Sequence, residues 1–426
     1  MMDDLRTRRR LDFPLFLAAL TLWVIGIFLV YSATYIHESG PLAGLYRQQI
    51  LWVAMALLII VLIVSIPARW IFNCSYLIYG ISLGLLVLVI AAGVTTMGAE
   101  RWIMVAGFKI QPSEFAKVGL LLALARYLSE KPVSLYNLPT FIVPGIMILV
   151  PFALVMKQPD LGTALVFCVM VLPMFYWSNL TLLDVFYIIS PIISLVLSAI
   201  PLLLSFNSGT SWGMFETLPW GVFFIVVIAA LYVTRSPIFL WIGVIIANIF
   251  SATITTIVWG SVLKDYQKMR IISFINPQAD PFGSGYQVIQ SKVAIGSGHI
   301  FGKGYLQGTQ SRLSFLPEQH TDFIFSVLGE QFGLVGCSFV IFLFLFLIIR
   351  GLTLTRNCRN RFINLTAIGC SAILGFHIFV NIAMTLGMMP VTGLPLPFLS
   401  YGGSFTVTVA VLVGLLLNAR VTDQDF

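Results

Sequence analysis

Carboxylates are scarce in this chain, with only 17 Asp and Glu among 426 residues. Asp322 stands out because it follows His320 and Thr321 and directly precedes the apolar run FIFSVL. A carboxylate at such a boundary, partly desolvated yet close to water, is placed to act as a general base. The alternative is a helix N-cap, since Asp at a first turn is favoured by capping and by the helix dipole. A single His-x-Asp pair is weak support for a metal ion, so no metal site is predicted.

A second group of ionisable residues lies in the segment ERWIMVAGFKIQPSEFAKVGL. Pro112 suits the first position of a helix, so Glu114 and Lys117 fall one turn apart on the same face and are expected to pair. The pair would make two charges tolerable inside a membrane or, with Arg101 nearby, would line a cavity that opens at one membrane surface. Both interpretations stay open from the residues alone.

Glycines and cations alternate between residues 275 and 325, with Gly-x-Gly steps at Gly283, Gly296 and Gly302. Such steps let the backbone turn tightly and present N–H groups. The cations of this segment are Lys292, Lys303 and Arg312. We expect them to bind an anionic, phosphate-bearing ligand, with a surface loop of glycine turns and solvated cations as the alternative. GSGHIFGKG has the wrong spacing for a P-loop and lacks the Ser or Thr after Lys303, so it does not predict an ATP site.

The composition shows what kind of scaffold must position these residues. Hydrophobic residues make up 59% of the chain, charged residues make up 10%, and the mean hydropathy is +0.98. This leaves too little polar surface for a water-soluble globule, so lipid must cover most of the outside. The net charge of +7 does not indicate a nucleic-acid partner, because basic residues in such a chain first follow the sides of the membrane. We therefore expect an all-α, polytopic integral membrane helical bundle without a nucleic-acid partner.

Twelve stretches are long and apolar enough to span a membrane as helices. They lie near residues 14–35, 48–66, 71–93, 113–128, 138–156, 160–178, 183–206, 219–234, 237–260, 323–349, 363–388 and 403–419. Because the N-terminus and alternate loops are rich in Arg and Lys, both termini are expected in the cytoplasm. The predicted organisation is one integral membrane domain, residues 1–426, with a cytoplasmic N-terminus (1–13), a large extracytoplasmic loop (261–322) and a cytoplasmic tail (420–426).

Three features are expected on the outer side of this bundle. Residues 285–295 have apolar and polar residues on separate helical faces and are expected to form a helix that lies at the membrane interface or packs on the protein. Residues 389–404, MPVTGLPLPFLSYGGS, have too many Pro and Gly for a regular span and too few polar residues for a free loop, so they should dip back against the bundle. Asp160 follows a tight turn, where an N-cap is its default role.

Long motifs make the sequence resemble a known family. The run GSGYQVIQSKVAIGSGHIFGKGYLQGTQSRLSFLPEQHTDFIFSVLGEQFGLVG, residues 283–336, resembles the signature of the SEDS family (shape, elongation, division and sporulation), in its RodA branch. Further matches run along most of the chain: YSAT at 31–34, RW at 101–102, QPSEFAK at 111–117, QPDLGT at 158–163 and PLPFLSYGGS at 395–404.

The resemblance implies an inverting peptidoglycan glycosyltransferase that polymerises lipid II outside the bacterial cytoplasmic (inner) membrane during cell elongation and releases undecaprenyl diphosphate. It implies a class B penicillin-binding protein, a transpeptidase, as partner, together with other membrane proteins of the elongation complex. In that family, the Asp of the HTDFIF motif is the residue regarded as essential. The resemblance therefore makes Asp322 the candidate catalytic base in place of a simple helix cap. Similar matching assigns five residues to the central cavity: Arg101, Trp102, Glu114, Lys117 and Asp160.

Negative charge would develop on the leaving diphosphate, so cations must meet it there. The candidates are Arg101, Lys292, Lys303 and Arg312. A divalent ion, Mg²⁺ or Mn²⁺, is compatible with this chemistry, but no ligand cluster requires one and no other cofactor is expected. The family commonly has ten spans, so the two extra apolar stretches of this chain, within residues 183–260, are interpreted as an insertion for packing or for a partner.

Other functions stay open at this point. A flippase for the same lipid-linked precursor would also need a polytopic bundle with a charged cavity, although acids gathered near the outer side favour chemistry over transport. A scaffold that only recruits cell-wall enzymes would not need these charges. The cell-division paralogue of the same family is a further alternative, although GKGYLQGTQSRLSF fits the elongation branch better.

Overall fold

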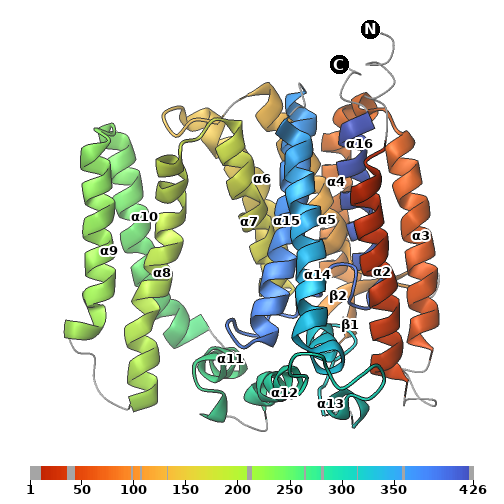
Figure 1. Cartoon of the computed structure of the whole chain (residues 1–426). Coiled ribbons are helices and arrows are strands. Elements are labelled where there is room, and N and C mark those ends of the chain that lie inside the picture. The colour runs from red at the N-terminus through yellow and green to blue at the C-terminus, as the bar shows by residue number, and fades with distance from the viewer. Residues whose placement is uncertain are drawn as a thin grey trace. The chain divides into compact units, whose positions relative to one another are not determined.

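The computed structural model describes residues 11–35, 44–96, 99–105, 108–131, 133–208, 214–262, 265–279, 283–313, 315–356 and 360–421. Helices dominate the described chain (Figure 1), which confirms the predicted fold class. The chain divides into two compact units. Unit 1 comprises residues 1–131, 142–174 and 286–426, and unit 2 comprises residues 132–141 and 175–285. That residues 1–426 behave as one membrane domain stays a prediction.

Unit 1 carries most of the helices and all of the predicted site residues. Its helices are α2 (Phe13–Thr34), α3 (Leu45–Ser65), α4 (Ala68–Ala92), α5 (Pro112–Glu130), most of α6 (Leu138–Lys157), of α7 (Leu161–Ser178) and of α12 (Ser284–Ser297), then α13 (Thr309–Arg312), α14 (Ile324–Arg356), α15 (Arg361–Thr385) and α16 (Gly403–Val421). The most apolar windows of α15 and α16 are 72% and 78% buried, against 22% for α3 and α4. Helices α15 and α16 therefore form the core of unit 1, and the outer helices turn apolar side chains towards lipid.

Unit 2 contains α8 (Leu182–Ser208), α9 (Met214–Val233), α10 (Ile238–Ile257), a π-helical turn (Val258–Val262), α11 (Asp265–Ile275) and a short 3₁₀ turn (Pro277–Ala279). Hydrogen bonds between polar side chains join α8 to α10 and α9. Asn248 donates to Ser190 Oγ (2.9 Å), and the Trp220 indole donates to Ser194 Oγ (2.6 Å). In lipid, where water cannot compete, such bonds help to hold helices together.

Ten helices in the described part of the chain are long and apolar enough to cross a membrane: α2, α3, α4, α6, α7, α8, α10, α14, α15 and α16. The other two predicted spans coincide with α5 and α9. Helix α5 carries Glu114, Lys117, Arg126 and Glu130, and the apolar part of α9, Thr217–Val233, is shorter. The chain is thus a multi-pass membrane protein, while the count of twelve spans stays a prediction.

A small antiparallel sheet lies between α4 and α5, where sequence analysis predicted no strands. Its strands are β1 (Val94–Thr96), β2 (Ala99–Val105) and β3 (Phe108–Ile110), in the order β1-β2-β3. Strand β2 is central, with Trp102 opposite Val94 and Met104 opposite Lys109. The sheet thereby holds Arg101 and Trp102 next to the first turn of α5.

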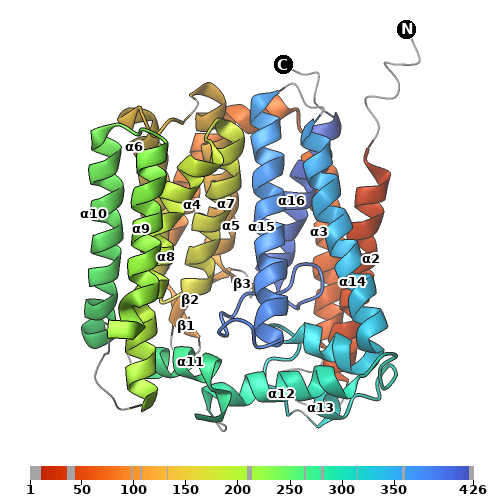
Figure 2. The ribbon, with the colours of Figure 1, turned by 60° about the vertical axis from the view of Figure 1, so that its left-hand side comes forward.

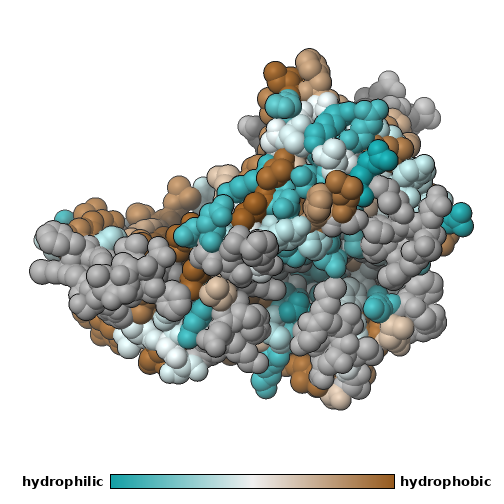
Figure 3. Space-filling view, turned by 90° about the horizontal axis from the view of Figure 1, so that it is seen from below, coloured by the Kyte–Doolittle hydropathy of each residue, from teal (hydrophilic) through white to brown (hydrophobic). Residues whose placement is uncertain are grey.

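A buried carboxylate joins both ends of the chain in unit 1. Asp12 caps α2 by accepting from Leu15 N (3.2 Å), and it also accepts from Arg350 of α14 (2.9 Å) and from Arg420 of α16 (2.7 Å). Helices α12 and α13 lie at the opposite end of unit 1 (Figures 1 and 2). Hydrophilic residues are exposed among apolar ones at that end, which faces the viewer in Figure 3. Unit 1 thus has one end where α2 begins and α16 ends, and an opposite end that carries the predicted outer helix.

The segment that we call the re-entrant segment, residues 386–402, has neither helix nor strand. Its apolar side chains Leu394, Leu396, Phe398 and Leu399 are at most 2% exposed. Phe398 packs edge-on against Trp23 of α2, with ring centroids 5.2 Å apart. These contacts confirm the prediction that this stretch dips back against the bundle. Helix α12 coincides with the predicted helix 285–295, but its place at the membrane interface stays a prediction.

Candidate active site

Asp322 lies in a tight turn that leads into α14 and is half-buried. One carbonyl closes the turn: the backbone N–H groups of Thr321, Asp322 and Phe323 all donate to Glu318 O at 3.1–3.3 Å. Glu318 itself has a positive φ of 51°. The position of the Asp322 backbone is therefore fixed by the turn and does not depend on a long loop.

Asn381 of α15 ties this turn to the re-entrant segment. Its amide Nδ2 donates both to Asp322 O (2.9 Å) and to Leu394 O (2.8 Å), and Asn381 is fully buried. Gly393, the neighbour of Leu394, has a φ of +73°, and a Cβ at this position would lie 3.6 Å from Asp322 Oδ2. One side of the Asp322 carboxylate thus lies against the backbone of the re-entrant segment.

Two further bonds fasten the same turn to the end of the re-entrant segment. Ser400 Oγ donates to Thr321 O (2.6 Å), and Tyr401 N donates to His320 O (2.9 Å). Burial raises the pKa of Tyr401, so its phenol stays protonated; its hydroxyl lies 2.5 Å from Gln48 Oε1, to which it donates. The backbone of the HTD motif is therefore held against the end of the re-entrant segment.

The predicted Glu114–Lys117 ion pair is confirmed. Lys117 Nζ lies 2.8 Å from Glu114 Oε1, and the side chains are 0% and 4% exposed. The same ammonium lies 3.1 Å from His377 Nε2 of α15, and it stands over the ring of Phe405 at 5.7 Å from the centroid. The other imidazole nitrogen, Nδ1, lies 3.4 Å from Pro395 O in the re-entrant segment. A buried charge pair is therefore connected to the segment that touches Asp322.

Arg101 and Asp160 meet at the start of α7. Asp160 caps that helix, as predicted, by accepting from Thr163 N (3.1 Å) and Thr163 Oγ1 (3.0 Å). Arg101 donates to Gln158 O (2.9 Å) and to Pro159 O, and its Nη1 lies 3.7 Å from Asp160 Oδ2. Its side chain remains 31% exposed, so the guanidinium is anchored while part of it faces the surroundings.

The re-entrant segment brings these groups into one neighbourhood. It contacts the Asp322 turn through Asn381 and the Lys117 cluster through His377. It also packs on the first turn of α7, since a Cβ at Gly162 would lie 2.7 Å from Thr392 O. A half-buried carboxylate can remove a proton from a substrate, and cations of the same site can stabilise the negative charge that develops. Trp102, half-buried on β2, lies beside Arg101.

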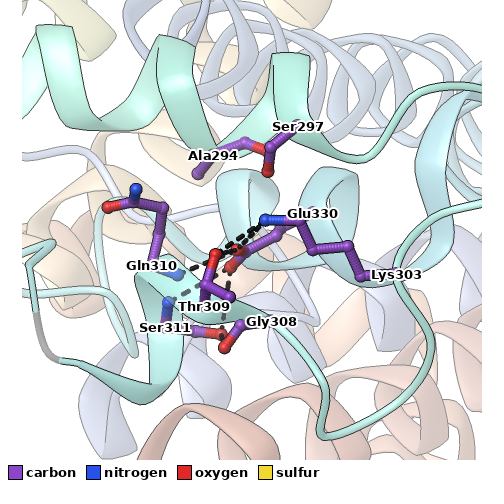
Figure 4. A network of polar contacts seen from close by, with 8 residues as sticks. All are labelled: Ala294, Ser297, Lys303, Gly308, Thr309, Gln310, Ser311 and Glu330. Atoms are coloured by element: carbon purple, nitrogen blue, oxygen red, sulfur yellow. Dashed lines mark hydrogen bonds and ion pairs between the residues drawn. The ribbon is translucent and has the colours of Figure 1, made fainter.

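Lys303 lies in a different environment, bound to the first half of α14 (Figure 4). Its Nζ contacts Glu330 Oε1 (3.1 Å) and Thr309 Oγ1 (2.7 Å). The fully buried Glu330 also accepts from Gln310 N (2.8 Å) and Ser311 N (3.1 Å), at the first turn of α13. These bonds give Lys303 and Glu330 a structural role in folding the loop onto α14.

The glycines of this loop serve the same packing. Helix α14 is broken at Gly333, where φ is 62° and ψ is −159°. The loop enters this break: Lys303 N and Gly304 N donate to Glu330 O and Gln331 O, each at 3.0 Å. A Cβ at Gly298 or Gly302 would overlap the backbone of α14, so both positions need glycine for close approach.

The remaining predicted cations are exposed. Arg312 is the last residue of α13, and its side chain points away from the core. Lys292 on α12 is exposed, and it lies over the start of the re-entrant segment, because a Cβ at Gly387 would come 2.7 Å from its Nζ. Lys292, one of the cations between residues 275 and 325, thus contacts the re-entrant segment, which also lies next to Asp322.

Sequence analysis missed His377 and Asn381, which link the parts of the site. Both are polar residues inside a predicted span, which is the signal that could have identified them. No group of three or more His, Cys, Asp or Glu side chains in the described residues could hold a metal ion.

Fold and site together define a multi-pass membrane protein with a polar cluster at one end of an apolar helical bundle. The chain belongs to the cell cycle protein family FTSW_RODA_SPOVE, whose model matches residues 13–210 and 219–425. This agrees with the family resemblance found in the sequence motifs.

Similar proteins span nearly the whole chain. The peptidoglycan glycosyltransferase MrdB of Escherichia coli is 36% identical over 393 residues, which are 92% of this chain and 90% of that protein. The peptidoglycan glycosyltransferase RodA of Treponema pallidum is 35% identical over 423 residues, with 96% and 98% covered.

Two solved structures are similar to this chain. One is described as the structural coordination of polymerization and crosslinking by a peptidoglycan synthase complex; it has a TM-score of 0.70 at 27% identity and covers 98% of this chain and 99% of the other. The rod shape determining protein RodA of Thermus thermophilus has a TM-score of 0.60 at 25% identity, with 96% of each chain covered.

Proposed function

We propose that this chain is an inverting peptidoglycan glycosyltransferase that polymerises lipid II into glycan strands and releases undecaprenyl diphosphate. Two relatives, 36% and 35% identical over the aligned residues, are named peptidoglycan glycosyltransferases. The observation that carries the proposal is the arrangement around Asp322, whose backbone is held by Asn381 while its carboxylate lies beside Gly393. Catalytic carboxylates need this kind of fixed backbone and a half-buried setting.

In the proposed reaction, the Asp322 carboxylate takes the proton of a sugar 4-hydroxyl on the acceptor. The resulting oxygen attacks the anomeric carbon of the donor, the bond from that carbon to the diphosphate oxygen breaks, and the configuration inverts. The proton ends on Asp322, and the negative charge ends on the departing diphosphate. In the transition state, protein side chains must therefore accept the proton and stabilise the negative charge on the diphosphate.

Cations of the site are proposed to bind the diphosphate. Arg101 is the strongest candidate, because its guanidinium is anchored by two backbone carbonyls and is still 31% exposed. Lys292 over Gly387 and the exposed Arg312 could approach the ligand from the loop side. Lys117 and Glu114 are fully buried and paired, so we propose that they shape the site and set its electrostatic field. We propose that Asp160 positions Arg101 and that Trp102 binds the substrate.

We propose that the site faces the outside of the cytoplasmic membrane, with both termini in the cytoplasm, and that the chain works with a class B penicillin-binding protein in cell elongation. Two observations support this assembly. A similar structure is described as a peptidoglycan synthase complex that coordinates polymerization and crosslinking, and the T. thermophilus relative is named for rod shape. The two units of the fold would act as one membrane domain, residues 1–426.

Purified protein tests the activity directly. The full chain, with and without a class B penicillin-binding protein, is given fluorescent lipid II in detergent, and glycan products are separated on a gel. The proposal predicts a ladder of glycan chains that a muramidase digests. The same protein in lipid II vesicles without any glycan product, but with lipid II moved between leaflets, would contradict the enzyme and support a transporter.

A further inference from the structure

His377 is the group in this site that sequence analysis did not predict and that the proposed reaction does not use. It is 1% exposed, in the middle of α15, and its ring packs against Phe405 with centroids 5.0 Å apart. Its two nitrogens face different partners, Lys117 Nζ at 3.1 Å and Pro395 O at 3.4 Å. Both ring nitrogens therefore have a polar partner, as buried polar groups generally do.

The partners fix which nitrogen carries the proton. Lys117 is an ammonium paired with Glu114, and it has protons to donate but no lone pair to offer. His377 Nε2 must therefore accept, which places the single ring proton of the neutral imidazole on Nδ1. From there it is donated to Pro395 O. The Lys117 ammonium thus donates to the Glu114 carboxylate on one side and to the His377 imidazole on the other, and the imidazole donates in turn to the Pro395 carbonyl.

The Pro395 end of these hydrogen bonds lies next to the proposed base. Pro395 follows Leu394, whose carbonyl accepts from Asn381, and Asn381 also holds the Asp322 backbone. His377 and Asn381 are four residues apart on α15 and hence on one face of the helix. Together they hold Leu394 and Pro395 by adjacent carbonyls, and Gly393, immediately before them, is the residue beside the Asp322 carboxylate.

We infer that His377 is a positioning residue for glycan polymerisation. Through its Nδ1–H bond to Pro395 O, it holds the re-entrant segment against Asp322, and the buried Glu114–Lys117 pair fixes its tautomer from the other side. This inference rests on the proposed function. It assigns the buried ion pair an indirect task, which is to orient the imidazole that sets the position of the segment.

Three substitutions separate positioning from packing. In His377→Asn, the amide reaches about as far as Nδ1 of His and can donate to Pro395 O. In His377→Gln, the amide reaches about as far as Nε2 and can accept from Lys117. His377→Phe keeps an aromatic ring without either nitrogen. Polymerisation of lipid II is measured over a range of substrate concentrations. We expect His377→Asn to keep kcat within about threefold, and His377→Gln and His377→Phe to lose on the order of 10- to 100-fold in kcat with little change in KM.

The outcome of this series distinguishes two failures. If the unmodified protein makes no glycan, the proposed function fails. If it makes glycan and all three variants match it, or if Asn and Gln lose the same amount, the positioning role of His377 is contradicted while the function stands.

A measurement on the unmodified protein does not depend on how the variants fold. The chain has four histidines, so ¹⁵N-histidine labelling gives few signals, and a His377→Phe sample identifies the one that disappears. We expect a neutral ring protonated on Nδ1. A ring protonated on Nε2, or on both nitrogens, would contradict the inference.

Discussion

The chemistry of this protein depends on charges held where lipid, not water, surrounds the fold. Lys117 has no exposed surface, and its ammonium is satisfied by Glu114 and His377. An ion pair in such a place stabilises little by itself, because removing both ions from water offsets most of their attraction. Removing one partner alone is different, since it leaves the other charge buried without a counterion.

The first prediction follows from this asymmetry. Lys117→Met should lower the free energy of unfolding by about 3–5 kcal/mol, because Glu114 is then left buried without its cation. The double variant Glu114→Gln, Lys117→Met should recover at least half of that loss. Thermal unfolding of the detergent-solubilised protein measures both. Glu114→Gln alone is measured as well, and a double variant that loses as much stability as the sum of the two single variants would show that the pair does not act as a unit.

For single residues, the sequence predicted the charged side chains of the site better than the hydrogen bonds that connect them. Asp322, Glu114 and Lys117 could be named because charges are rare in an apolar chain, and a spacing of three residues on a helix predicts a pair. His377 and Asn381 were missed because their partners, Pro395 and Asp322, come from other parts of the chain. Only the fold shows that these residues meet.

The loop between α12 and α14 packs closely against the backbone of α14. Gly302 has a φ of +80°, and a Cβ there would overlap the Gln331 carbonyl, whereas a Cβ at Gly296 meets no described atom within 4 Å. Both glycines belong to Gly-x-Gly steps that suggested a phosphate site. The structure instead gives the two glycines different surroundings, one against the backbone of α14 and the other in α12.

The second prediction uses these two glycines as a matched pair. Gly302→Ala should lower the free energy of unfolding by about 2 kcal/mol or more, because it adds a left-handed backbone penalty to a steric clash. Gly296→Ala should be neutral or stabilising by up to about 1 kcal/mol, since it lies in a helix. Thermal unfolding of both variants decides the matter. Equal stability of the two would contradict the packing role given to Gly302.

Elements were predicted where one physical rule dominates. Apolar runs give the spans, because free backbone groups cannot be left in lipid, and Pro and Gly in residues 389–404 exclude a regular helix. The strands β1 to β3 were missed, since β1 and β3 have three residues each and lie in a loop between helices. Such short strands carry no clear alternation of polar and apolar residues.

Unit 1 has two chemically different ends. Asp12, Arg350 and Arg420 meet at the end where α2 begins and α16 ends, and helices α12 and α13 lie at the other end of unit 1. Basic residues near the terminal end agree with a cytoplasmic location by the positive-inside rule. The proposed reaction needs Asp322 on the opposite side, where lipid-linked precursors are polymerised.

The third prediction concerns this orientation. Pro317→Cys lies just before the Asp322 turn, and Thr353→Cys lies near the far end of α14; both positions are exposed. A thiol reagent that cannot cross membranes should label Pro317→Cys in intact cells, and Thr353→Cys only after the cells are opened. Labelling in the reverse order would place Asp322 in the cytoplasm and remove the basis of the mechanism.

The central claim is that the Asp322 carboxylate accepts the proton during glycan polymerisation. Its most direct test is the rate of lipid II polymerisation by Asp322→Asn, which keeps the size of the side chain, compared with Glu318→Gln, which neutralises a carboxylate in the same turn. We predict that Asp322→Asn loses about 10²-fold or more in kcat and that Glu318→Gln stays within about threefold of the unmodified protein. Normal polymerisation by Asp322→Asn would contradict the account.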